Sequence, residues 1–60
     1  MTNQERAQKI MEAYKAEDTY NFPNDGVAAA IREIANCFKY DSYLCADDFY
    51  EIANELEALQ

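Results

Sequence analysis

The two cysteines of this chain, Cys37 and Cys45, bracket the segment CFKYDSYLC, whose residue types could do chemistry. Structural zinc sites usually combine four Cys or His ligands with closely spaced cysteine pairs. Here seven residues separate the cysteines, and the chain has no histidine. A nucleophilic thiolate needs a nearby cation or base, whereas Asp47 and Asp48 follow Cys45. We therefore expect neither a metal site nor a catalytic cysteine, and no cofactor.

Two structural interpretations of the same segment remain. A disulfide between Cys37 and Cys45 is sterically conceivable in a helical hairpin, because it requires Cα atoms within roughly 7 Å. Alternatively, Cys45 is the N-cap of a helix, which puts Asp48 at the capping-box position and gives Leu44 and Phe49 the spacing of a hydrophobic staple. Cys37 is then a small, half-buried apolar residue. The absence of a signal peptide predicts a cytoplasmic protein with reduced thiols, which favours the capping interpretation.

The last third of the chain concentrates carboxylates. Residues 40–60 hold six acidic residues and no Lys or Arg. Four of them follow helical spacing and predict an acidic row: Asp47, Asp48, Glu51 and Glu55. A calcium loop would need a turn glycine and alternating oxygen ligands, which DSYLCADDFYE lacks. The row is therefore either a solvated face or a docking surface that imitates a line of phosphates.

Tyrosine is abundant, with five residues in a chain of 60. Tyr40 and Tyr43 lie in the second predicted connection, and Tyr50 lies one turn into the following helix, so we expect them to gather at one end of the molecule. Tyrosine is enriched at protein interfaces. These rings either cover the end of a small core or extend the acidic row into a partner-binding surface.

Three predicted helices must position these residues. One glycine, one proline and a half-apolar composition favour an all-α fold of one domain, residues 1–60. Apolar spacing predicts helices over residues 3–17, 25–39 and 46–59. Thr2 and Glu5 have capping-box spacing at the first, and Pro23 is expected to lie in the turn before the second.

The apolar stripes predict how the helices pack. The expected core positions are Ala7, Ile10, Met11 and Tyr14 in the first helix, Val27, Ile31, Ile34 and Phe38 in the second, and Phe49, Ile52, Leu56 and Leu59 in the third. Asn24 or Asp25 could cap the second helix. The short second connection predicts a small three-helix bundle in which the second and third helices form an antiparallel hairpin, with the first packed across it.

Charge and composition exclude several functions. The net charge of −7 argues against direct binding of nucleic acid or an anionic membrane and fits a basic protein partner. No apolar run approaches the length of a membrane span. An enzyme is not expected, since the chain has no histidine, no phosphate-binding loop and no metal-ligand set. A DNA-reading third helix is excluded by its negative charge.

In size, acidity and helix content, from MTNQERAQKIMEAYK to ADDFYEIANELEAL, the chain resembles small phage and mobile-element proteins that block host defence or polymerases, such as anti-CRISPR and anti-restriction proteins. The resemblance implies a non-enzymatic inhibitor of a nucleic-acid-handling protein. The acidic row with Tyr40, Tyr43 and Tyr50 would then be the contact surface. The alternative is a self-assembling structural or regulatory module, in which the alanine-rich side of the second helix pairs two copies as a homodimer.

Overall fold

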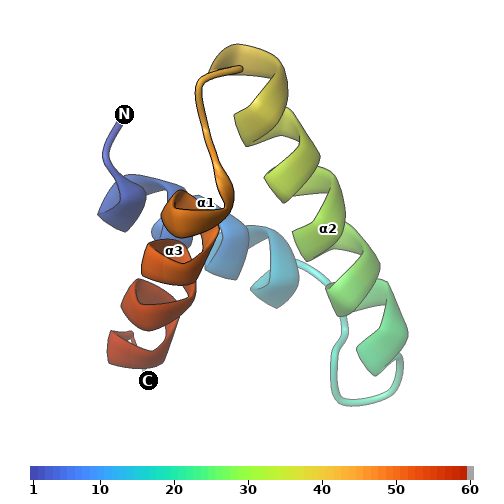
Figure 1. Ribbon diagram of the computed structural model, residues 1–60. Coiled ribbons are helices and arrows are strands. Elements are labelled where there is room, and N and C mark those ends of the chain that lie inside the picture. Colours follow the sequence, from blue (N-terminus) through green and yellow to red (C-terminus); the bar gives the residue numbers. More distant parts are fainter. Residues whose placement is uncertain (60) are drawn as a thin grey trace.

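The computed structural model describes residues 1–59, which form three α-helices and no strand: α1 (Asn3–Lys15), α2 (Pro23–Tyr40) and α3 (Ala46–Ala58). α1 packs against both of the other helices. α2 and α3 run in opposite directions and splay apart, and α1 passes behind α3 toward α2 (Figure 1). The predicted all-α three-helix bundle is thus confirmed, and its α2–α3 hairpin is open, with α1 making the closer contacts.

The ends of α2 and α3 meet through one aromatic pair. The rings of Phe38 and Phe49 stack with their centroids 5.4 Å apart and their planes inclined by 15°. Offset stacking of this kind stabilises aromatic pairs beyond the area they bury. This ring stack holds α2 and α3 together at the end of the open hairpin where the two helices are joined. None of the three helices in residues 1–59 has the length and apolarity needed to cross a membrane.

The start of α1 follows the predicted capping box. The Glu5 amide donates to Thr2 Oγ1 at 3.1 Å, and the Thr2 amide donates to Glu5 Oε1 at 3.1 Å. The hydrogen bond that the Glu5 carboxylate accepts from the Thr2 backbone, and then the interaction of that carboxylate with the Thr2 hydroxyl, hold the pKa of Glu5 below its usual range. α1 ends at Lys15, two residues earlier than the sequence predicts.

α2 begins at Pro23 rather than at residue 25, so the prediction that this proline lies in the preceding turn is wrong. Proline suits the first helical position, because its fixed φ is helical and its missing N–H has no partner there anyway. Neither Asn24 nor Asp25 is the cap; Phe22 occupies that position without a side-chain hydrogen bond.

The first turn of α2 lies very close to the end of α1. Gly26 is buried, and a Cβ atom added there would lie 2.5 Å from Thr19 Cγ2 and 2.9 Å from the Tyr14 ring. Only glycine fits this approach without displacing a neighbour. Gly26 therefore sets the distance between the two helices.

The core is small and centres on Ala7 and Ile10 of α1 and Ile52 of α3. α2 contributes Ala30 and Ile34, which pack against this cluster. The other predicted core residues of α2 are turned outward: Val27, Ile31 and Phe38 are 50%, 59% and 45% exposed. α2 faces the core and α1 with Ala30, Ile34 and Cys37, and this orientation turns Val27, Ile31 and Phe38 toward solvent.

Candidate functional site

The predicted cap of α3 is present. The Cys45 amide donates to Asp48 Oδ2 at 3.0 Å, and the Cys45 thiol donates to the same oxygen at 3.3 Å. Asn3 Nδ2 of α1 donates to Asp48 Oδ1 at 3.4 Å. The hydrogen bonds from Cys45, and then that from Asn3, hold the pKa of Asp48 below its usual range. Through these hydrogen bonds Asp48 stabilises the start of α3. Leu44, at the predicted position of the hydrophobic staple, is buried.

Both cysteines are free thiols, so the disulfide interpretation does not describe this structure. Cys37 is buried on the face of α2 that meets α1, more deeply than the predicted half-buried position. Burial raises the pKa of its thiol, and the nearby Glu33 adds to the effect. Cys45 is exposed. No group of three or more His, Cys, Asp or Glu side chains in residues 1–59 lies close enough together to hold a metal ion.

The acidic row lies on the solvent side of α3. Asp47 and Glu51 are exposed, and Asp48 and Glu55 are half-buried. Within residues 1–59, none of these four carboxylates forms a salt bridge. From the first to the last of these four carboxylates the helix rises about 12 Å, in steps of about 1.5, 4.5 and 6 Å. The mean of about 4 Å per carboxylate is close to the value of about 3.4 Å per phosphate along one strand of DNA. This face therefore presents anionic charge at the linear density of a single nucleic-acid strand.

The three tyrosines of the predicted site do not cover the core. Tyr40, Tyr43 and Tyr50 are 84%, 93% and 73% exposed. Tyr40 ends α2, Tyr43 lies in the connection and Tyr50 lies in the first half of α3. They offer aromatic area to solvent along the same part of the chain that begins the acidic row, as a partner-binding surface requires.

The sequence interpretation missed an ion pair in which Arg6 is buried and Asp41 is half-buried. Arg6 is only 6% exposed. Its Nη2 lies 2.7 Å from Asp41 Oδ2, and its Nη1 donates to Asn3 Oδ1 at 2.6 Å. The signal for Arg6 is its spacing of four from Ile10, which places it on the core stripe of α1. The ion pair links α1 to the segment that joins α2 to α3.

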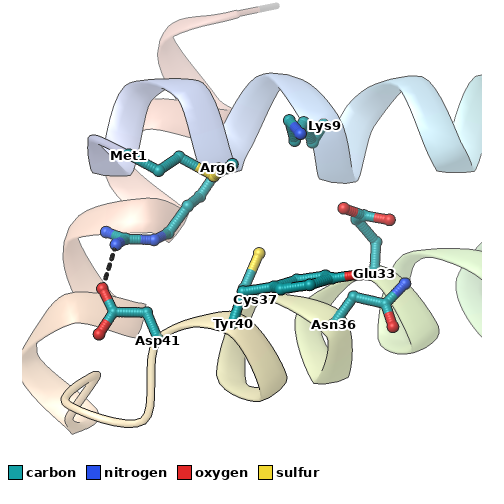
Figure 2. A pocket seen from close by; sticks show the side chains of 8 residues that line it. All are labelled: Met1, Arg6, Lys9, Glu33, Asn36, Cys37, Tyr40 and Asp41. Carbon is teal, nitrogen blue, oxygen red and sulfur yellow. Dashed lines mark hydrogen bonds and ion pairs between the residues drawn. The ribbon is translucent and has the colours of Figure 1, made fainter.

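A pocket of about 390 Å³ opens beside this ion pair, between α1 and α2 (Figure 2). Figure 2 shows Lys9 of α1 on one side and Glu33 of α2 on the other, with the Cys37 sulfur between the helices. The volume is within the range of small-molecule sites, but those are predominantly apolar, and this pocket carries both signs of charge. Burial, and then the nearby Glu33, raise the pKa of Cys37, which disfavours the thiolate that nucleophilic attack requires.

Comparison of the chain with known protein families, with curated proteins and with solved structures finds no match.

Proposed function

We propose that this protein is a non-enzymatic inhibitor that binds the basic groove of a nucleic-acid-handling protein through α3. Its docking surface, here called the acidic face, comprises Asp47, Asp48, Glu51 and Glu55 with the exposed rings of Tyr40, Tyr43 and Tyr50. The observation that carries the proposal is the row of carboxylates at phosphate-like spacing, in which no member has a salt-bridge partner within residues 1–59.

The members of the acidic face have different roles in this proposal. Asp47 and Glu51 are exposed and supply charge that a basic groove can neutralise. Asp48 also holds the α3 cap through its hydrogen bonds with Cys45, so its charge contributes from a fixed position. Tyr43 and Tyr50 supply apolar contact area beside the charges. Fixed charges with adjacent aromatic rings favour fast, oriented association with a basic surface.

The second half of the row, Glu51 and Glu55, is not explained by the stability of the isolated chain. Glu51 and Glu55 are four residues apart on one helix, where like charges repel by about 0.2–0.5 kcal/mol. The last turn of α3 contains no basic residue, although a cation there would interact favourably with the helix dipole. A partner that brings Lys and Arg to α3 would remove both unfavourable terms.

The test is capture of the partner from a lysate of the host cell, with the purified protein immobilised. We expect capture at 0.1 M salt and loss at 1 M salt, because the Debye length falls from about 10 Å to about 3 Å. The variant Glu51→Lys/Glu55→Lys should lose the captured protein at both concentrations. The captured protein should lose its own nucleic-acid binding when the inhibitor is added.

The matched control is Glu12→Lys/Glu17→Lys, which changes two exposed residues of the N-terminal part of the chain. Each Glu→Lys change adds two charges, so both double variants move the net charge from −7 to −3. Capture by the control should match the wild type. Equal capture by both double variants, or binding by the α3 variant at wild-type affinity in both salts, would contradict phosphate imitation by this face.

A further inference from the structure

One exposed side of α2 carries an apolar row. Val27, Ile31, Ala35 and Phe38 follow spacings of four, four and three, which places them within about 80° of one another on the helix. Val27, Ile31 and Phe38 are 50%, 59% and 45% exposed, and Ala35 is exposed. Single exposed apolar residues are ordinary, but a contiguous apolar face marks an interaction site. We propose that this row pairs with the same row of a second copy of the chain, giving a two-fold symmetric dimer.

The charge distribution favours a second copy of the chain as the partner that binds the apolar row of α2. The residues of α2 balance to zero, with Asp25 and Glu33 against Arg32 and Lys39. The chain as a whole carries −7, so two copies repel least where α2 meets α2. A basic partner would gain most on the acidic α3 and little on the neutral α2 row. The neutral apolar face therefore fits an equally neutral apolar face, which the second copy supplies.

The exposed area also fits a dimer. The accessible surface of the chain is 4529 Å², whereas a compact monomer of 6.9 kDa exposes about 4,000 Å² by the scaling of surface with mass. The radius of gyration of 11.3 Å likewise exceeds the value of about 10.4 Å for a compact chain of this length. If both copies bury their excess accessible surface in the contact, the dimer removes about 1,000 Å² in total from solvent, which is the lower bound for a specific interface. This area corresponds to a weak, concentration-dependent dimer.

The row is complementary to itself when two α2 helices run antiparallel. A two-fold axis midway between Ile31 and Ala35 sets each Ile31 against Ala35 of the second copy, and each Val27 against Phe38 of the second copy. Larger side chains then meet smaller ones, as interdigitating helices require. The stack with Phe49 already holds Phe38 in place, so little of its side-chain freedom is lost on pairing. An isologous contact of this kind closes at two copies.

The experiment is analytical ultracentrifugation of the full chain between about 1 μM and about 1 mM, a range that brackets weak association. The wild type should pass from monomer to dimer, and added salt should strengthen the dimer by screening the like net charges. Ile31→Glu should weaken dimerisation at least tenfold. The matched control, Asn36→Glu, adds the same charge on the opposite side of α2 at another exposed position and should dimerise like the wild type. Far-UV circular dichroism should show equal helicity for all three.

A mixing experiment tests the antiparallel pairing. Ile31→Glu protein mixed with Ala35→Lys protein should associate at least tenfold more tightly than Ile31→Glu alone, because the introduced carboxylate of one copy faces the introduced ammonium of the other. A wild type that stays monomeric to about 1 mM overturns the dimer, and so does equal association of Ile31→Glu and Asn36→Glu. No gain on mixing overturns the antiparallel arrangement. None of these measurements contains a basic partner, so they succeed or fail separately from the proposed inhibition.

Discussion

Removal of the Asp41 carboxylate should destabilise the protein through Arg6. In Asp41→Ala the guanidinium of Arg6, 6% exposed, keeps only its hydrogen bond to Asn3. A hydrogen bond to a charged group contributes about 1.5–3 kcal/mol, and breaking a fully buried ion pair costs about 3–5 kcal/mol. The Asp41 side chain is 37% exposed, so water replaces part of the lost interaction. We expect a loss of about 2 kcal/mol, within the charged hydrogen-bond range.

The assay is urea unfolding followed by circular dichroism, with a thermal melt in parallel. A loss of 2 kcal/mol corresponds to a fall in Tm of roughly 8–16 °C for a domain of this size. Asp41→Asn should lose less, about 1 kcal/mol, because its single amide oxygen can still accept from Arg6, although the hydrogen bond that Asp41 Oδ1 accepts from the Tyr43 amide at 3.2 Å is lost. Glu57→Ala, which removes an exposed carboxylate, is the control and should stay within about 0.5 kcal/mol of the wild type.

A double-mutant cycle decides whether the effect passes through the ion pair. Arg6→Met keeps the apolar stem of the side chain and removes the buried charge, so Asp41→Ala should cost far less in that background. The coupling energy should be at least about 1 kcal/mol. If the two substitutions are additive, or if Asp41→Ala costs no more than Glu57→Ala, the ion pair does not stabilise the fold and the reasoning is refuted.

Three further expectations concern the helix ends and the thiols. Gly26→Ala should destabilise the protein by about 1 kcal/mol in a thermal melt, because overpacking costs about 1–3 kcal/mol and exceeds the gain of about 1 kcal/mol in helix propensity; a raised Tm would contradict the close approach. An alkylating reagent should modify Cys45 at least tenfold faster than Cys37, whose thiol is buried with a raised pKa. Mass spectrometry should find this difference abolished in urea, and equal rates in the folded protein would disprove it. Because the pKa of Asp48 is lower when folded, its contribution is present above the ordinary carboxyl pKa of about 3.9 and is lost as pH falls below it. In Asp48→Asn this loss should be absent, and identical acid melts of the variant and wild type would exclude the effect.

The helix ends show which signals in the sequence were sufficient to predict where a helix begins. Both capping boxes were predictable, because a cap is a contact between residues three apart and needs no knowledge of tertiary packing. The start of α2 was predicted wrongly because proline is compatible with two places, the turn before a helix and the first helical position. No local signal distinguished them. The first turn of α2 packs at Gly26 against Tyr14 and Thr19, and such contacts cannot be predicted from the local sequence.

The packing of α2 shows what periodicity alone could not determine. Its apolar stripe is wide, with Ala30, Ile34 and Cys37 along one edge and larger residues along the other. Periodicity located the stripe but gave no reason to choose an edge. Tertiary packing placed the edge of Ala30, Ile34 and Cys37 against the core and α1, since the two small residues in it let α1 approach closely. The exposure of Ile31 and Phe38 follows from that choice.

The candidate site was predictable in its charges but only partly in its contacts. The solvent position of Asp47 and Glu51 follows from the apolar residues on the opposite side of α3. The hydrogen bond between Asn3 and Asp48 joins residues 45 apart in sequence, and the ion pair of Arg6 with Asp41 joins residues 35 apart. Contacts of that separation depend on where α1 crosses the hairpin, which no local pattern encodes.

The two exposed surfaces differ because α1 lies between the other helices. Its position buries one edge of α2 and one edge of α3, and residues 1–59 form no fourth helix that could cover the rest. The uncovered edge of α2 is apolar and neutral, and that of α3 is acidic. Salt should therefore act in opposite directions on them: it screens the repulsion between two like-charged copies that meet at α2, and it screens the attraction between α3 and a basic groove. Association that strengthens with salt belongs to the α2 row, and association that weakens with salt belongs to the acidic face.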